Sequence, residues 1–98
     1  LRAESQGMDE WVERNWKNYV QSRRNGTIRL KRESFLALPG ALQFRLFDKV
    51  LRSLDPASGL DFKSWEKMEK GIRQGRYRVN LPRDLDFRLS PKKLEIQR

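Results

Sequence analysis

The basic residues are the part of this sequence whose type and spacing could do chemistry. Seven of them lie in segment 11–32, where the one acid is Glu13. Six more lie in segment 63–78, where the acids are Glu66 and Glu69. An unbalanced excess of positive charge repels itself unless a polyanion neutralises it. Lysine and arginine neutralise phosphates and release counterions from nucleic acid, so the chemistry indicated is polyanion binding, with nucleic acid favoured over a membrane surface.

Catalytic and metal-binding groups are scarce by comparison. The neighbouring carboxylates are Asp9 and Glu10, Glu66 and Glu69, and Asp84 and Asp86. Each pair is interleaved with basic residues or set in a turn, which is typical of solvated surface charge. Histidine and cysteine are absent, which excludes disulfides, Cys/His zinc sites and imidazole-activated nucleophiles. The glycines match no dinucleotide-binding or P-loop pattern. We therefore expect no active site, no metal site and no cofactor in this chain.

Length and composition bound the architecture. The chain has 98 residues, a net charge of +9 and 37% hydrophobic residues, which suits one small domain spanning residues 1–98. The longest apolar run is too short to cross a bilayer, and the first residues lack the apolar core of a signal peptide. Because the chain opens on leucine and not methionine, we expect it to be a piece of a longer protein, and the absence of cysteine fits a cytoplasmic one.

Helical periodicity dominates the first two thirds of the chain. Apolar residues from Met8 to Val20 predict a helix from about residue 3 or 8 to Arg23, ended by the Asn25-Gly26 signal. Segment 27–30 is predicted to be extended and segment 33–38 to form one helical turn. A second helix is predicted to start at Pro39 and to be the most buried element. Its apolar residues are Leu42, Phe44, Leu46, Phe47, Val50, Leu51 and Leu54.

A third helix is predicted to follow Asp61, which suits an N-cap, with Leu60 packing on Trp65. Its inner face comprises Phe62, Trp65, Met68 and Ile72. Its opposite face carries Lys63, Lys67 and Lys70 at steps of four and three. We interpret Gly71 and Gly75 as marks of the helix end, with Gly75 just past the cap.

The last quarter of the chain changes to a period of two, which predicts strands. The alternating apolar positions are Tyr77, Val79 and Leu81, then Leu85, Phe87 and Leu89, then Leu94 and Ile96. Turns are predicted at 82–84 and 90–93. The fold class predicted is therefore α+β, with about three helices followed by a small antiparallel β meander whose apolar face the helices cover.

Segment 36–47, LALPGALQFRLF, resembles the substrate-binding domain of bacterial tRNA(Ile)-lysidine synthetase. The order of later segments is also similar to that family: LDF at 60–62, RQGR at 73–76, VNLP at 79–82, LDFR at 85–88 and LEI at 94–96. The likeness covers nearly the whole chain, although each motif is short. Two departures are Gln43, where the family usually has arginine, and Arg83-Asp84, where glycines are common.

The resemblance implies a non-catalytic domain that positions tRNA. In that family, a separate N-terminal catalytic domain uses ATP and Mg²⁺ to attach lysine to the wobble cytidine of an isoleucine tRNA. Its SGGxDS loop is absent here. The implied partners are tRNA and that catalytic domain, and the implied compartment is the cytoplasm.

Ten residues are predicted to contact RNA phosphates. They are Arg23, Arg24, Arg29, Lys31, Arg32, Lys67, Lys70, Arg73, Arg76 and Arg78. Arg45 and Lys49 are set aside because their helix is expected to be mostly buried. The spacing of Trp11, Trp16 and Tyr77 favours a role in the hydrophobic core over a role in stacking on nucleic-acid bases. The alternatives are a generic RNA-binding domain or a module that docks on protein, the latter suggested by Phe44 and Phe47 beyond the main apolar stripe.

Overall fold

The computed structural model describes residues 2–81 and 83–98, with side chains from residue 7 onward. The elements in chain order are α1 (Arg2–Asn15), the 3-10 turn η1 (Trp16–Tyr19), β1 (Val20–Arg24), β2 (Thr27–Leu30), α2 (Arg32–Leu36), α3 (Gly40–Leu54), α4 (Phe62–Arg73), β3 (Tyr77–Leu81), β4 (Leu85–Leu89) and β5 (Leu94–Gln97). This order confirms the predicted α+β class.

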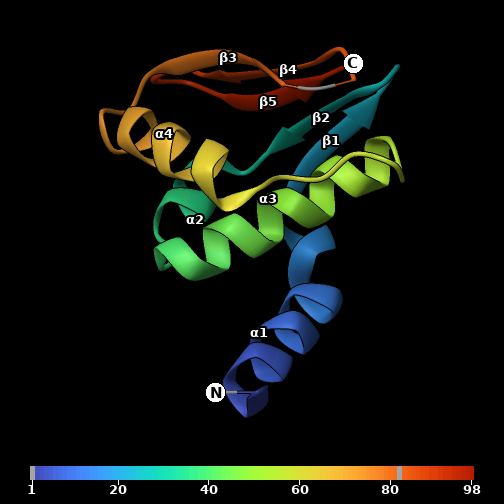
Figure 1. Ribbon diagram of the computed structural model, residues 1–98. Coiled ribbons are helices and arrows are strands. Elements are labelled where there is room, and N and C mark those ends of the chain that lie inside the picture. The colour runs from blue at the N-terminus through green and yellow to red at the C-terminus, as the bar shows by residue number, and fades with distance from the viewer. Residues whose placement is uncertain (1, 82) are drawn as a thin grey trace.

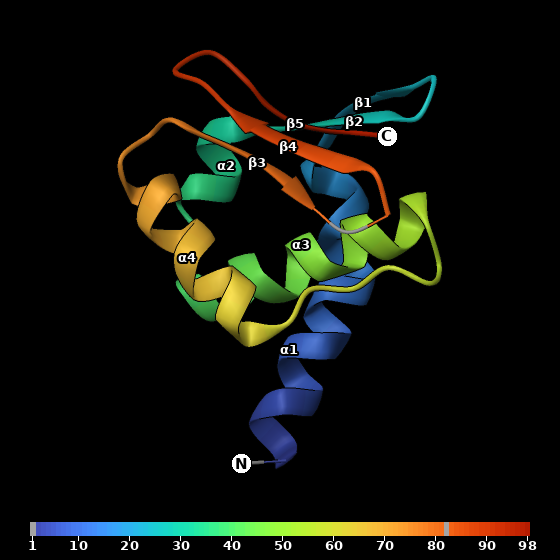
Figure 2. The same cartoon turned by 45° about the horizontal axis from the view of Figure 1, so that its top comes forward.

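The strands form one antiparallel sheet in the order β1-β2-β5-β4-β3. The predicted meander, β3-β4-β5, is confirmed, and the hairpin β1-β2 extends it on the β5 side. Helices α2, α3 and α4 lie against one face of the sheet, and the opposite face is uncovered (Figures 1 and 2). Helix α1 projects from the body on the side away from the sheet (Figure 1).

The predicted first helix was too long. It ends at Asn15, and the segment predicted as its last turns forms η1 and β1. Asn25 and Gly26 have φ angles of 52° and 77°, which fit a two-residue hairpin turn rather than a helix end. Strand β1 pairs with β2, which satisfies the backbone hydrogen-bonding groups of this segment. The stabilisation from this pairing exceeds the helix preference that the apolar spacing indicates.

Helix α3 provides the centre of the core, as predicted. Leu46, Phe47 and Val50 are fully buried, and the Phe47 ring lies 5.0 Å from the ring of Phe87 in β4. Gln43, one of the two departures from the family pattern, is also buried. Its Nε2 donates to the carbonyl oxygen of Phe35 at 3.0 Å, so the side chain ties α3 to the end of α2.

Helix α4 starts and stops where the sequence predicts. The Asp61 carboxylate accepts a hydrogen bond from the Ser64 N–H at 2.7 Å, and this bond lowers the pKa of Asp61. Gly75 has a φ of 80° just past the helix. Gly71, in contrast, lies inside α4, where a Cβ would come within 2.1 Å of the Tyr77 ring. It is thus a packing glycine and not a helix end.

Phe62 corrects the predicted inner face of α4. It is 62% exposed, because as the first helical residue it precedes the turn that packs on the core. Its ring meets the ring of Phe44 edge-on, with centroids 6.0 Å apart.

The β3–β4 turn places two non-glycine residues in an unusual backbone conformation. Arg83 and Asp84 have φ angles of 66° and 61°, in the left-handed region that favours glycine. Arg83 Nε donates to the Asp55 carboxylate at 2.6 Å. This bond, with one from the Ala57 N–H, lowers the pKa of Asp55 and anchors the turn to the end of α3.

Candidate nucleic-acid interface

The uncovered face of the sheet carries rows of polar side chains set by the strand register. Residues paired across antiparallel strands share a face. One row, read from β1 to β3, is Ser22, Arg29, Glu95, Arg88 and Arg78. The next row toward the hairpin turn is Arg24, Thr27, Gln97, Asp86 and Asn80.

At the other end of the sheet, four residues lie directly outside the strands: Lys31 follows Leu30, Ser90 follows Leu89, Lys93 precedes Leu94 and Arg76 precedes Tyr77. Since side chains alternate along a strand, we assign these four to a third row on the same face. We call these three rows the outer face. Its described side chains include seven lysines and arginines and two carboxylates, so a large share of the net charge of +9 lies on one surface.

Each carboxylate of the outer face lies between two cations. Glu95, whose side chain is 8% exposed, lies 3.5 Å from Arg29 Nη2 and 3.4 Å from Lys93 Nζ. Asp86 Oδ2 accepts from Arg88 Nε at 2.8 Å and lies 3.8 Å from Arg78 Nη2. Two of these ion pairs join neighbouring strands, Arg29 with Glu95 and Arg78 with Asp86, and the other two lie within one segment of the chain.

The hairpin end of the outer face is hollowed. An open depression of about 430 Å³ is lined by Ser22, Arg24, Asn25, Thr27 and Arg29. Two guanidinium groups, two hydroxyls and an amide suit hydrogen bonds to phosphate and ribose oxygens.

Five of the ten predicted contact residues lie on the outer face. They are Arg24, Arg29, Lys31, Arg76 and Arg78. Strands β2 and β3 are far apart in the sequence but belong to one sheet, with β5 and β4 between them, so their outward side chains lie on the same face. The sequence could not indicate this shared face.

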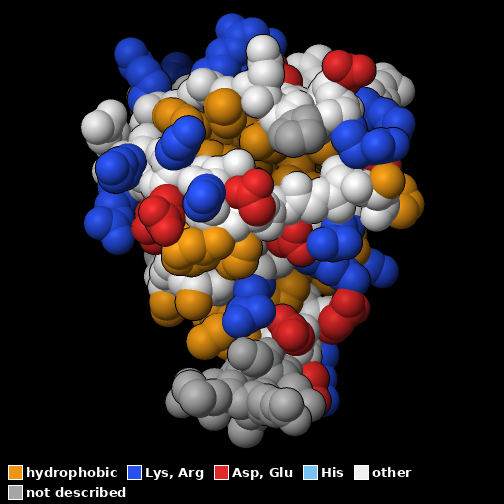
Figure 3. Space-filling view, in the orientation of Figure 1, with side chains coloured by type: hydrophobic (Ala, Val, Ile, Leu, Met, Phe, Trp, Pro, Cys, Tyr) orange, Lys and Arg blue, Asp and Glu red, His pale blue; other side chains and the backbone are white. Residues whose placement is uncertain are grey.

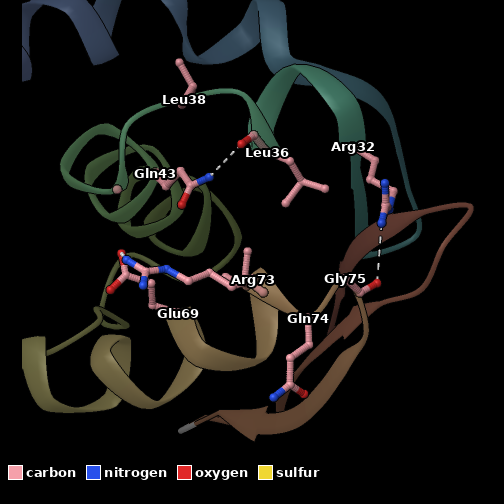
Figure 4. Close-up of a pocket in the computed structure, with 10 residues that line it drawn as sticks. Arg32, Leu36, Leu38, Gln43, Glu69, Arg73, Gln74 and Gly75 are labelled. Carbon is pink, nitrogen blue, oxygen red and sulfur yellow. Dashed lines mark hydrogen bonds and ion pairs between the residues drawn. The ribbon is translucent and has the colours of Figure 1, made fainter.

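Two other predicted residues serve the fold. Arg23 pairs with the inward-facing Ile28, and its Nη2 donates to the Ser53 carbonyl oxygen at the end of α3. Arg32 is largely buried, with 16% of its side chain exposed. Its Nε donates to the carbonyl oxygen of Ser90, and its Nη2 donates to the carbonyl oxygen of Gly75 (Figure 4).

The remaining three, Lys67, Lys70 and Arg73, lie exposed on α4, in the helical layer. Arg73 Nη2 is 3.8 Å from the Glu69 carboxylate. Figure 3 shows Lys and Arg side chains both along the top of the molecule, over the sheet, and on the left, over α4. Along the chain, the cations of α4 are followed by Gln74 and Gly75 and then by Arg76, the first cation of the outer face in this segment.

Arg88 and Lys93 lie on the outer face but were not among the predicted contacts. Two features of the sequence could have indicated them: the apolar alternation in segment 85–89 for Arg88, and the predicted turn at 90–93 for Lys93. If Leu85, Phe87 and Leu89 face the core, Arg88 must face away from it.

The set-aside cations have structural partners. Arg45 Nη1 lies 3.1 Å from the Asp9 carboxylate, and Lys49 pairs with Glu13. Both pairs join α3 to α1. Trp11, Trp16 and Tyr77 pack against the core as expected, and the described side chains of the outer face include no aromatic ring. These side chains therefore offer no platform for base stacking.

The polar side chains that line the cavity beside α4 already have hydrogen-bond or ion-pair partners within the chain. A cavity of about 440 Å³ between α2, α3 and α4 is lined by Arg32, Gln43, Glu69 and Arg73 (Figure 4), all engaged in the contacts given above. Among the side chains described, no group of three or more carboxylates could hold a metal ion. Within residues 2–81 and 83–98, no helix is both long and apolar enough to cross a membrane.

Comparison with protein families, with curated proteins and with solved structures gives no match to this chain.

Proposed function

We propose that the outer face binds the phosphate backbone of RNA, and that the chain is a tRNA-positioning domain. The observation that carries the proposal is the concentration of seven cations, against two carboxylates, on the one sheet face that no helix covers. A face of this kind is a poor core surface and a good phosphate-binding surface.

The resemblance to the substrate-binding domain of lysidine synthetases supports tRNA as the ligand. Under this proposal, a catalytic domain outside this chain binds ATP and Mg²⁺ and modifies the wobble cytidine in the cytoplasm. The present domain contributes binding energy and orientation.

The mechanism is phosphate neutralisation with release of counterions. Arginines on neighbouring strands meet successive phosphates, and the hydroxyl and amide groups of the outer face meet ribose hydroxyls. Such contacts fix position and orientation without reading base sequence.

A salt series with unmodified tRNA and this chain tests the proposal. If about six phosphates are neutralised, the logarithm of the association constant falls with a slope of about −5 against the logarithm of salt concentration, which weakens binding roughly 1,000-fold between 50 and 200 mM salt. Affinity that barely changes over this range would contradict the proposal.

An exposed apolar groove favours a second function, protein docking. A groove of about 390 Å³ is lined by Ala41, Phe44, Phe62, Trp65 and neighbours, and hydrophobic side chains gather below α4 (Figure 3). Phe47, one of the two residues that suggested this alternative, is fully buried and does not contribute.

Phe62→Ser separates the two functions. Because Phe62 is exposed and distant from the outer face in the fold, the substitution should leave tRNA affinity within about twofold. Loss of binding to a catalytic domain supplied in trans, measured by calorimetry, would support docking through this groove. Loss of tRNA affinity would count against the division of the two surfaces.

A further inference from the structure

We propose that Glu95 and Asp86 are positioning residues that make the outer face selective for A-form RNA over other polyanions. This inference rests on the proposed function, because it assigns a role to two acids within the proposed binding surface.

Glu95 is the clearer of the two. A carboxylate that faces bound phosphates repels them, yet this one stands in the central strand of the basic surface and is almost fully buried. Both its oxygens are used: Oε2 pairs with Arg29 of β2, and Oε1 pairs with Lys93. The first contact crosses from β5 to β2, and the second is to a cation two residues before Glu95, so one carboxylate contacts both side chains.

Asp86 does the same on the other half of the sheet. Its Oδ2 holds Arg88 at 2.8 Å within β4 and approaches Arg78 of β3 at 3.8 Å. Its Oδ1 is buried and has no hydrogen-bond partner among the described groups. The carboxylate therefore acts on the two arginines through one oxygen.

The consequence is a fixed array of cations. Strands lie about 4.8 Å apart, and residues on one face of a strand recur about every 6.8 Å. Arginine and lysine side chains that are held to this grid lose little further freedom on binding. Mobile cations adapt to any polyanion, whereas a fixed array favours the backbone whose phosphate spacing and groove shape it fits. A-form RNA is recognised by shape and by its 2′-hydroxyls.

The test compares Glu95→Gln with a matched control, Glu10→Gln. Glu10 is exposed on α1, away from the sheet, so both variants gain one unit of net charge but only the first frees cations of the outer face. Binding to an RNA hairpin stem and to a DNA duplex of the same sequence is measured by fluorescence anisotropy at several salt concentrations.

We expect Glu95→Gln to bind the DNA duplex several-fold more tightly and the RNA stem with unchanged affinity, so that the RNA/DNA affinity ratio falls by the same several-fold factor. In Glu10→Gln this ratio should stay within twofold of the unsubstituted chain. Asp86→Asn, which frees Arg78 and Arg88 instead, should also lower the ratio and provides the test if Glu95→Gln fails to fold.

An equal gain for RNA and DNA in the folded variants would overturn the inference, since the carboxylates would then act by charge alone. An unsubstituted chain that binds RNA with strong salt dependence but shows no RNA/DNA preference would overturn it as well, while leaving the proposed function intact. Failure of the unsubstituted chain to bind RNA would contradict the proposed function itself.

Discussion

The two faces of strand β4 differ sharply: one is packed in the hydrophobic core, and the other is charged and uncovered. Phe87 is fully buried and lies between the rings of Phe47 and Tyr77. Arg88, the next residue, is on the uncovered face and pairs with Asp86. The inner face stabilises the fold through apolar burial, whereas the partly exposed ion pairs of the outer face are expected to contribute little to stability. Stability and binding should therefore respond to different substitutions.

The largest expected effect is on the inner face. Phe87→Ala should lower the free energy of unfolding by about 3–5 kcal/mol, because it leaves a cavity beside Phe47 and Tyr77. Arg88→Ala should change it by less than about 1 kcal/mol while weakening RNA binding. Urea denaturation of both variants measures the contrast. A similar loss of stability in both would mean that the outer face also supports the fold.

A second comparison separates the outer face from the cations of α4. Arg29→Glu combined with Arg78→Glu should weaken tRNA binding about 100-fold at low salt, or about 2.7 kcal/mol, since two phosphate contacts become repulsive. Lys67→Glu combined with Lys70→Glu makes the same change in charge in the helical layer and should cost less than about tenfold. Electrophoretic mobility shift gives both values. The reverse order would move the binding surface to α4.

Two glycines test the packing of α4 on the sheet. Gly71→Ala places a methyl group against the Tyr77 ring and should destabilise the fold by about 1–3 kcal/mol. Gly7→Ala, in α1, meets no atom within 4 Å and should be neutral or stabilising by up to about 1 kcal/mol, because alanine favours the helix. Thermal melts followed by circular dichroism compare them. Equal melting temperatures would show that Tyr77 can move away from α4.

The smallest expected effect is on the loss of folding stability at low pH. The folded-state pKa values of Asp55 and Asp61 are lowered below 3.8 by the hydrogen bonds they accept. Their contribution to stability is present at neutral pH and is lost as pH falls below about 4 through the folded-state pKa values. Asp61→Asn keeps the helix cap and should reduce the loss of stability between pH 5 and pH 2.5. Urea midpoints at these two pH values test this, and an unchanged acid dependence would argue against the cap as its source.

Local signals made much of the fold predictable. The Asp61 cap, the Gly75 helix end, the central helix after Pro39 and the period-two strands of the last quarter are confirmed. The first helix was overextended because Val20 fits both a helical stripe and the start of a strand, and Asn25-Gly26 suits either a helix stop or a hairpin. Only the pairing of β1 with β2 decides between these interpretations.

For the candidate site, the sequence by itself determined the excess of basic residues, the two segments that carry them, and the absence of histidine and cysteine. Tertiary structure decided which of these cations share a surface. The strand order places β2 and β3 in one sheet, with β5 and β4 between them, so that Arg88 and Lys93 join the same surface. Arg23 and Arg32 instead donate hydrogen bonds to backbone carbonyl oxygens of the fold. The physical reason is that side-chain alternation is local to a strand, whereas the neighbours of each strand depend on long-range pairing.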